Sequence, residues 1–136
     1  MTRYATSSLK AQKRRKVIYN APSHVRGKIM SATLSKELRE QNGGVRSLPI
    51  HTGDEVEITR GQFKGRKGTV KAVYRLRYQV LVDRIERETA RGKTVNIPFK
   101  ASTLRITKLQ MNAHRETVLQ RKQQGRAAAA EQKNKA

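Results

Sequence analysis

The sequence predicts a mainly β fold, small and strongly bent, with a basic extension on either side. Within residues 48–109, five short stretches alternate apolar with polar residues, as half-buried strands do. Residues 1–47 carry 11 basic and 2 acidic residues, residues 48–109 carry 14 and 6, and residues 110–136 carry 6 and 2. We therefore expect a basic N-terminal extension with short helices (1–47), a β domain (48–109), and a C-terminal helix with a basic tail (110–136).

The five expected strands are identified by their apolar positions. These are Val56 and Ile58, then Val70, Ala72 and Tyr74, then Tyr78, Val80 and Val82, then Val95, Ile97 and Phe99, and last Leu104 and Ile106. Residues 75–77 make a tight connection, and Gly92 suits the tip of a hairpin. Five strands in about 60 residues favour a small SH3-like barrel, because closure limits exposed edges. The strand phase places Tyr74 and Tyr78 in its core.

Short helices are expected in the N-terminal extension. A basic helix within residues 8–20 ends before Pro22, which disfavours helix at the preceding residue. A second short helix carries Arg26 and Lys28. Ser35 suits the N-cap of a third helix, 36-KELREQ-41, which 42-NGG-44 stops.

One helix is expected after the β domain. Asn112 is placed to cap it, and its apolar contacts are Val118 and Leu119. We expect Gly125 to end this helix. The remaining tail, residues 126–136, has a biased, alanine-rich composition that is typical of a helical or frayed end.

The net charge narrows the partners to polyanions. The formal charge is +21, from 31 Lys and Arg against 10 Asp and Glu. Such a charge repels itself unless a polyanion neutralises it. No stretch approaches the run of about 20 apolar residues that spans a bilayer, and no apolar signal sequence begins the chain. The lack of cysteine fits a reducing cytosol and excludes thiolate metal sites. Nucleic acid is the favoured partner.

A glycine-rich, basic segment joins the first two expected strands. This glycine turn, residues 60–68, has Gly61, Gly65 and Gly68 among basic residues. A nucleotide-binding P-loop needs G-x-x-x-x-G-K-[ST]. The turn has only three residues between its first two glycines, and 92-GKT-94 has Arg87 where the upstream glycine belongs. Both segments fail as P-loops, so we expect no nucleotide or other small-molecule substrate.

Two explanations remain for the glycine turn. Its glycines serve simply to supply positive φ angles, as turn glycines usually do. Alternatively, small glycines let a phosphate backbone approach while neighbouring cations neutralise it. Four basic residues within eight positions, with no acid among them, favour the second explanation for the turn as a whole; they are Arg60, Lys64, Arg66 and Lys67.

The sequence gives no sign of an enzyme or a metal site. The three histidines, His24, His51 and His114, stand far apart and have no cysteine beside them. The acids at positions 54, 55 and 57 are interpreted as solvated strand edges, because no constellation around them suggests a pocket for acid–base work. We expect no catalytic residue, no metal and no cofactor.

The segment 53-GDEVEITRGQFKGRKGTVKAVY-74 resembles a KOW motif, the strand–turn–strand signature of ribosomal proteins and transcription elongation factors. The preceding 21-APSHVRGKIMSATLSKELREQ-41 and 45-VRSLPIHTGDEV-56 are more discriminating. Together they resemble the eukaryotic and archaeal branch of the ribosomal protein L twenty-four family, called L twenty-six in eukaryotes. The resemblance extends over nearly the whole chain.

This resemblance implies a structural, RNA-binding role in the large ribosomal subunit. It implies binding to large-subunit rRNA near the polypeptide exit tunnel, neighbouring large-subunit proteins as further partners, and a part in early subunit assembly and translation. It also implies a place on cytoplasmic ribosomes, with nucleolar passage during assembly in a eukaryote. No membrane partner is implied.

The expected RNA-binding residues come from three places. The N-terminal segment contributes Arg14, Arg15, Lys16, Tyr19, His24, Arg26 and Lys28. The glycine turn contributes Arg60, Lys64, Gly65, Arg66, Lys67 and Gly68, and the strand and connection after it contribute Lys71, Arg75 and Arg77. Tyr19, beside the basic cluster, is the tyrosine expected to stack on an unpaired base.

Two other function classes fit the sequence less well than the ribosomal one. A KOW module that regulates RNA polymerase usually sits within a longer multidomain chain, and the cationic arms at both ends of this chain argue against it. A protein bound to anionic membrane needs a strongly amphipathic helix, which the sequence lacks.

Overall fold

The computed structural model describes residues 10–135, with side chains up to residue 132. The first nine residues of the expected N-terminal extension and the last residue therefore lie outside the described part. Two helices, α1 (Ala11–Tyr19) and α2 (Ser23–Ile29), precede the sheet, and α3 (Lys36–Gln41) lies between its first two strands. The short 3-10 turn η1 (Ala101–Thr103) leads into the last strand, and α4 (Ala113–Lys135) ends the described chain.

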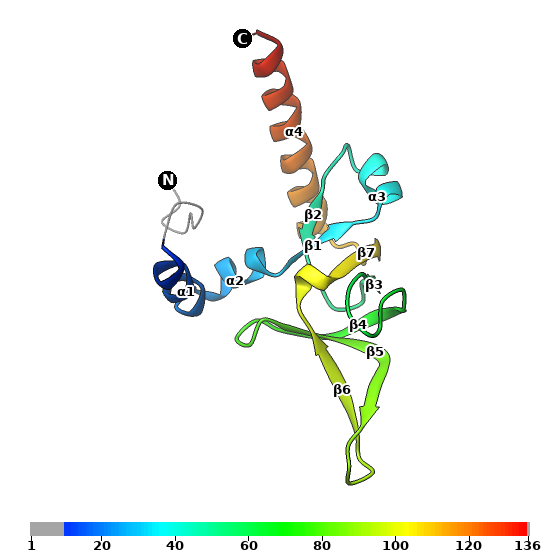
Figure 1. Cartoon of the computed structure of the whole chain (residues 1–136). Coiled ribbons are helices and arrows are strands. Elements are labelled where there is room, and N and C mark those ends of the chain that lie inside the picture. The colour runs from blue at the N-terminus through cyan, green and yellow to red at the C-terminus, as the bar shows by residue number, and fades with distance from the viewer. Residues whose placement is uncertain (1–9, 136) are drawn as a thin grey trace.

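Seven strands form one mixed sheet (Figure 1). They are β1 (Ser31–Leu34), β2 (Ser47–Pro49), β3 (Glu55–Ile58), β4 (Lys67–Tyr74), β5 (Gln79–Glu88), β6 (Thr94–Phe99) and β7 (Leu104–Lys108). Their order across the sheet is β2-β1-β7-β3-β4-β5-β6, and only the β1–β7 pair is parallel. The mainly β fold class and all five predicted strands are confirmed.

The sheet is not closed, which corrects the expectation of a closed barrel. A closed barrel made of the five predicted strands would require β7 to pair with β6. Instead β7 pairs on that side with β1, which in turn pairs with β2. These two strands were missed because their residues lie in or next to the segment that was expected to form short helices. They protect the outer edge of β7 in place of closure.

The core is built from residues of β1 to β5 and β7, of α4, and of the segments that connect these elements. Val56, Ile58, Leu104 and Ile106 are fully or almost fully buried, as the alternation in β3 and β7 requires. The two additional strands bring in Leu34 and Leu48, which are also fully buried, and helix α4 adds Leu119; the rest of the core is Met30, Ala32, Val45, Ile50, Val70, Val80, Val82, Ile85 and Ala101. The N-terminal extension thus forms part of the hydrophobic core.

Only one of the two tyrosines predicted to be in the core lies there. Tyr78 packs against the core, whereas Tyr74 is half exposed. The register between β4 and β5 shifts between Val70 and Ala72. Such a bulge reverses which residues face the core, so Val73 packs inward and Tyr74 points away.

The predicted helix signals are confirmed except for one. The Ser35 hydroxyl accepts a hydrogen bond from the Leu38 backbone N–H at 3.3 Å, and the Asn112 side chain accepts one from the Arg115 N–H at 2.8 Å. Gly125 does not end α4, which continues through Lys135. The four alanines at positions 127–130 have the highest helix propensity of any residue type, and they extend the helix past the glycine.

Candidate nucleic-acid interface

The glycine turn connects β3 to β4 and is held by backbone hydrogen bonds. The Gly65 N–H donates to the Ile58 carbonyl at 2.8 Å, and the Ile58 N–H donates to the Arg66 carbonyl at 2.9 Å. The Thr59 N–H and hydroxyl both donate to the Thr103 carbonyl at 2.9 Å. Gly65 has φ +85°, which favours glycine. The turn is therefore a rigid feature rather than a loose loop.

An aromatic contact fixes the tip of the turn. The Phe63 and Phe99 rings meet edge to face, with centroids 6.2 Å apart. The Arg66 guanidinium lies over the Phe63 ring, 5.1 Å from its centroid. This stacking holds the guanidinium in place while its charge stays exposed to solvent.

All four cations of the glycine turn are exposed, and in the described residues none forms an ion pair. Glu57 lies opposite Lys67 in the β3–β4 ladder, yet its carboxylate pairs with Arg105 of β7 at 4.0 Å. Glu55 likewise pairs with Lys108, at 3.5 Å. The nearby acids are thus directed to β7, which leaves the charge of the turn available to an anionic partner.

The glycines of the turn have different roles. A methyl group added at Gly61 or Gly65 would meet no atom within 4 Å, so their surroundings are open. At Gly68, a Cβ would lie 2.7 Å from Val82 Cγ1 and 2.8 Å from the Asp83 carbonyl oxygen. Gly68 therefore serves the close packing of β4 on β5, and its predicted RNA contact has no support from its surroundings.

The basic residues of α1 and α2, apart from Arg26, are also exposed. Arg14, Arg15 and Lys16 project from α1, and His24 and Lys28 from α2. Tyr19 is 68% exposed, which leaves its ring free for the predicted stacking. It borders a groove of about 480 Å³ whose lining also includes Arg77 and Lys100. Tyr19, which is expected to stack on a base, and Arg77, which is also expected to bind RNA, thus border the same groove.

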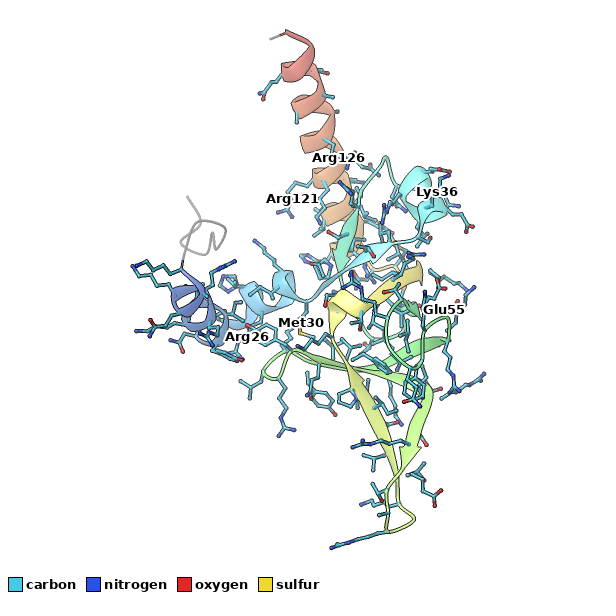
Figure 2. All side chains as sticks on the ribbon, in the orientation of Figure 1. Arg26, Met30, Lys36, Glu55, Arg121 and Arg126 are labelled. Atoms are coloured by element: carbon cyan, nitrogen blue, oxygen red, sulfur yellow. The ribbon has the colours of Figure 1, made fainter. Side chains whose placement is uncertain are left out.

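Arg26 differs from its neighbours, because its donors are used within the chain. Its Nε donates to the Ala21 carbonyl at 2.7 Å, its Nη2 to the Tyr19 carbonyl at 2.7 Å, and its Nη1 to the Leu76 carbonyl at 3.2 Å. Figure 2 shows Arg26 where α2 meets the β4–β5 connection. We therefore assign Arg26 to holding the helices against the sheet, and leave it out of the RNA surface.

Further contacts complete this helix–turn junction, by which we mean α1 and α2 together with residues 75–78. The Tyr78 hydroxyl donates to the Ile18 carbonyl at 2.5 Å. The Arg75 guanidinium carbon lies 3.6 Å from the position of a Cβ at Gly27. The junction brings the predicted residues of the N-terminal segment to the same end of β4 as Arg75 and Arg77. Lys71 is exposed on β4 between this end and the glycine turn.

Sequence reasoning missed a buried ion pair that positions α4. Arg115 contacts both carboxylate oxygens of Asp54, at 2.5 and 2.8 Å, and also donates to the Pro49 and Gln110 carbonyls. The Asp54 carboxylate accepts two further bonds, from the backbone N–H groups of His51 and Gln110. Both side chains are buried, so the interpretation of Asp54 as a solvated edge was wrong.

The packing of α4 on the sheet also affects two titratable groups. Burial lowers the pKa of His51 from its ordinary value of 6.5; the charges of Arg115, Arg75 and His114 lower it further, and Asp54 opposes them. Lys122 of α4 donates to the Ser47 carbonyl at 2.6 Å, and burial lowers its pKa as well. Asp54, Arg115 and Lys122 therefore attach α4 to β2 and β3.

The chain was compared with known proteins. Residues 8–122 match the model of a family described as ribosomal proteins L26 of eukaryotes and L24 of archaea. The chain belongs to this family. Related proteins named large ribosomal subunit protein uL24 are 46% identical over 115 residues in Caenorhabditis elegans and 47% over 124 residues in Littorina littorea. A third, from Schizosaccharomyces pombe, is 43% identical over 121 residues.

The matches extend over most of both chains. They cover 85%, 90% and 89% of this chain, and 80%, 85% and 94% of the three relatives in the same order. The resemblance inferred from the KOW motif and the segments before it is thereby confirmed. The family consists of ribosomal structural proteins, which agrees with the prediction that the chain is not an enzyme.

The described residues contain neither a candidate metal site nor a candidate membrane-spanning helix. Among residues 10–135, no group of three or more His, Cys, Asp or Glu side chains is arranged to hold a metal ion. No helix of the part that the structure describes has the length and apolar character needed to cross a bilayer.

Proposed function

We propose that the chain binds rRNA of the large ribosomal subunit through the glycine turn and the basic extensions, near the polypeptide exit tunnel. Its role is structural: it supports subunit assembly and translation on cytoplasmic ribosomes, and in a eukaryote it passes through the nucleolus during assembly. Neighbouring large-subunit proteins are its other partners. The relatives named as large ribosomal subunit proteins support this assignment.

The single observation that carries the proposal is that the four cations of the glycine turn are exposed and form no ion pair among the described residues. A rigid backbone holds Arg60, Lys64, Arg66 and Lys67 on the surface, and the neighbouring acids pair with β7 instead. Fixed cations without internal partners gain most from neutralising phosphates and releasing their counterions. Gly61 and Gly65, with open space around them, let a phosphate backbone come close to the turn.

The N-terminal helices extend this surface. The exposed basic residues of these helices and of the N-cap of α1 are Lys10, Lys13, Arg14, Arg15, Lys16 and Lys28. Helix α1 is short and has no buried residue of its own. Helices of this length are marginal by themselves, so we expect RNA to order α1 further on binding.

The test is sedimentation of a lysate that contains the tagged full chain, with subunits separated by lowering Mg²⁺. We expect the chain to migrate with the large subunit and to remain there in moderate salt. Migration with RNA polymerase, or retention at the top of the gradient, would contradict the proposal. In a second measurement, about ten neutralised phosphates give a log–log salt slope of about −7 to −9 for binding to large-subunit rRNA.

A further inference from the structure

A second groove lies on the side of the β4–β5–β6 ribbon that faces away from the core. Val80 is fully buried, and its ladder partners Val73 and Phe99 pack against the core. Because strand residues alternate between faces, Leu81 and Pro98, which are paired with each other, belong to the opposite face. The groove there has a volume of about 600 Å³, within the range of about 300–1,000 Å³ typical of ligand sites.

The lining of this groove combines an aromatic ring, amides and positive charge. It consists of Tyr74, Arg75, Leu76, Arg77, Gln79, Leu81, Asn96 and Pro98, together with Val73, which also packs against the core. Tyr74 is 50% exposed and Leu76 is 77% exposed. Two of the nine residues are arginines and none is acidic, so the groove suits an anionic ligand with a flat apolar part.

Asn96 contributes an unsatisfied polar atom. Its Oδ1 is buried and has no hydrogen-bond partner among the described residues. A buried acceptor without a partner is uncommon, because it loses its bonds to water and gains nothing in return. An incoming N–H group would remove this cost once the Asn96 amide turns its oxygen toward the groove. The edge of a nucleobase offers such a group beside a flat ring.

We infer that this groove takes one unstacked nucleobase of single-stranded RNA. The base stacks on Tyr74, its edge donates a hydrogen bond to Asn96 Oδ1, and the adjoining phosphate lies near Arg77. The inference rests on the proposed function, since it requires the chain to bind RNA. It adds to that function a recognition of single-stranded RNA, which the phosphate contacts of the glycine turn do not supply.

The position of the groove fits this ligand. It begins at residues 75–77, at the end of β4 opposite the glycine turn, and exposed Lys71 lies between the two. A strand of RNA whose backbone follows these cations would reach the groove at its end. The two arginines belong to the β4–β5 connection, and the two side-chain amides, those of Gln79 and Asn96, belong to β5 and β6. A phosphate and a base edge would therefore each meet a matching group.

The test measures binding of the full chain to two probes, a mixed-sequence single-stranded RNA of 12 nucleotides and the same sequence as a 12-base-pair duplex. Tyr74→Ala should weaken binding of the single strand about 5- to 100-fold, the loss expected for one stacked base. Tyr74→Phe keeps the ring and should bind as the parent does. Binding of the duplex, whose bases are already stacked, should be unchanged in both variants.

Asn96→Leu provides an independent readout. It should weaken binding of the single strand about 2- to 10-fold, as expected for one lost hydrogen bond. It should also raise the melting temperature of the free protein, because the unpaired buried acceptor is removed. A residue that served only the fold would lower the melting temperature when replaced.

The outcomes separate this inference from the proposed function. If the parent binds large-subunit rRNA and Tyr74→Ala and Asn96→Leu bind the single strand equally well, the groove does not hold a base. Loss of a protein neighbour in such variants, with RNA binding intact, would assign the groove to a peptide instead and overturn the inference. If the parent itself binds no RNA, the proposed function fails first.

Discussion

The junction of α4 with the sheet and the glycine turn both depend on arginine, but they use it in opposite ways. Arg115 is buried and bonds to the Asp54 carboxylate and to two carbonyl groups. Arg66 is exposed, rests on an aromatic ring and pairs with no acid among the described residues. The charge of the first arginine is therefore paired within the chain, whereas that of the second is unpaired among the described residues.

This difference shows how a chain of net charge +21 divides its cations. Arg115 and Arg26 satisfy backbone and carboxylate groups, and so hold helices against the sheet. The cations of the glycine turn and of α1 are displayed on the surface. Under this division, substitutions in the first group should affect stability, and substitutions in the second group should affect RNA binding.

The largest effect is expected at the buried ion pair. Arg115→Met keeps the apolar stem but leaves the Asp54 carboxylate buried without its cation. Breaking a buried pair in this way costs about 3–5 kcal/mol. We expect a loss of this size in the free energy of unfolding, measured by urea denaturation followed by circular dichroism.

Helix α4 itself offers the matched control. Arg121, an exposed arginine of the same helix (Figure 2), should tolerate methionine within about 0.5 kcal/mol. The double variant Asp54→Leu with Arg115→Met should recover part of the loss, because no charge is then left buried. Equal stability of Arg115→Met and the parent would show that the pair does not hold the fold.

A smaller effect is expected at the helix–turn junction. Arg26→Ala removes three hydrogen bonds from a half-buried guanidinium to backbone carbonyls, which should cost about 1–2 kcal/mol. Because these bonds join residues 19, 21 and 76, α1 should also become more sensitive to limited proteolysis. Lys28→Ala, on the same helix, should leave both readouts unchanged. The division fails here if Lys28→Ala destabilises the chain as much as Arg26→Ala.

The smallest effect is a dependence of stability on pH. The pKa of His51 lies below 6.5 in the folded protein, so well above pH 6.5 the group is neutral in both states. As the pH falls below 6.5, the unfolded chain binds the proton first, and stability is lost. The melting temperature of the parent should therefore fall between pH 7.5 and pH 6, and His51→Gln should fall less. The prediction is wrong if the two profiles are parallel.

Much of the fold was predictable because its signals are local. Strands β3 to β7 carry alternating residues, and Ser35 and Asn112 cap their helices as predicted. Strands β1 and β2 were not predicted, because their burial depends on partners far along the chain. The exposure of Tyr74 depends on a bulge, and no residue type marks that bulge in the sequence.

The positive charge of the site was predictable, but the roles of its individual residues were not. Exposed clusters such as residues 14–16 and the glycine turn are visible as runs of basic residues. Sequence alone could not separate Arg26 from Lys28, since only the folded chain brings the Leu76 carbonyl to Arg26. For the same reason Arg115 and Asp54, 61 positions apart, were not paired.

The most direct test of the division is the salt dependence of binding to large-subunit rRNA for Arg66→Ala with Lys67→Ala. Loss of two phosphate contacts should make the log–log slope shallower by about 1.4–1.8, with the melting temperature nearly unchanged. The charge-matched control, Arg91→Ala with Lys93→Ala, replaces two exposed cations in the turn between β5 and β6 and should keep the parent slope. An unchanged slope for Arg66→Ala with Lys67→Ala, together with a large fall in melting temperature, would contradict the account.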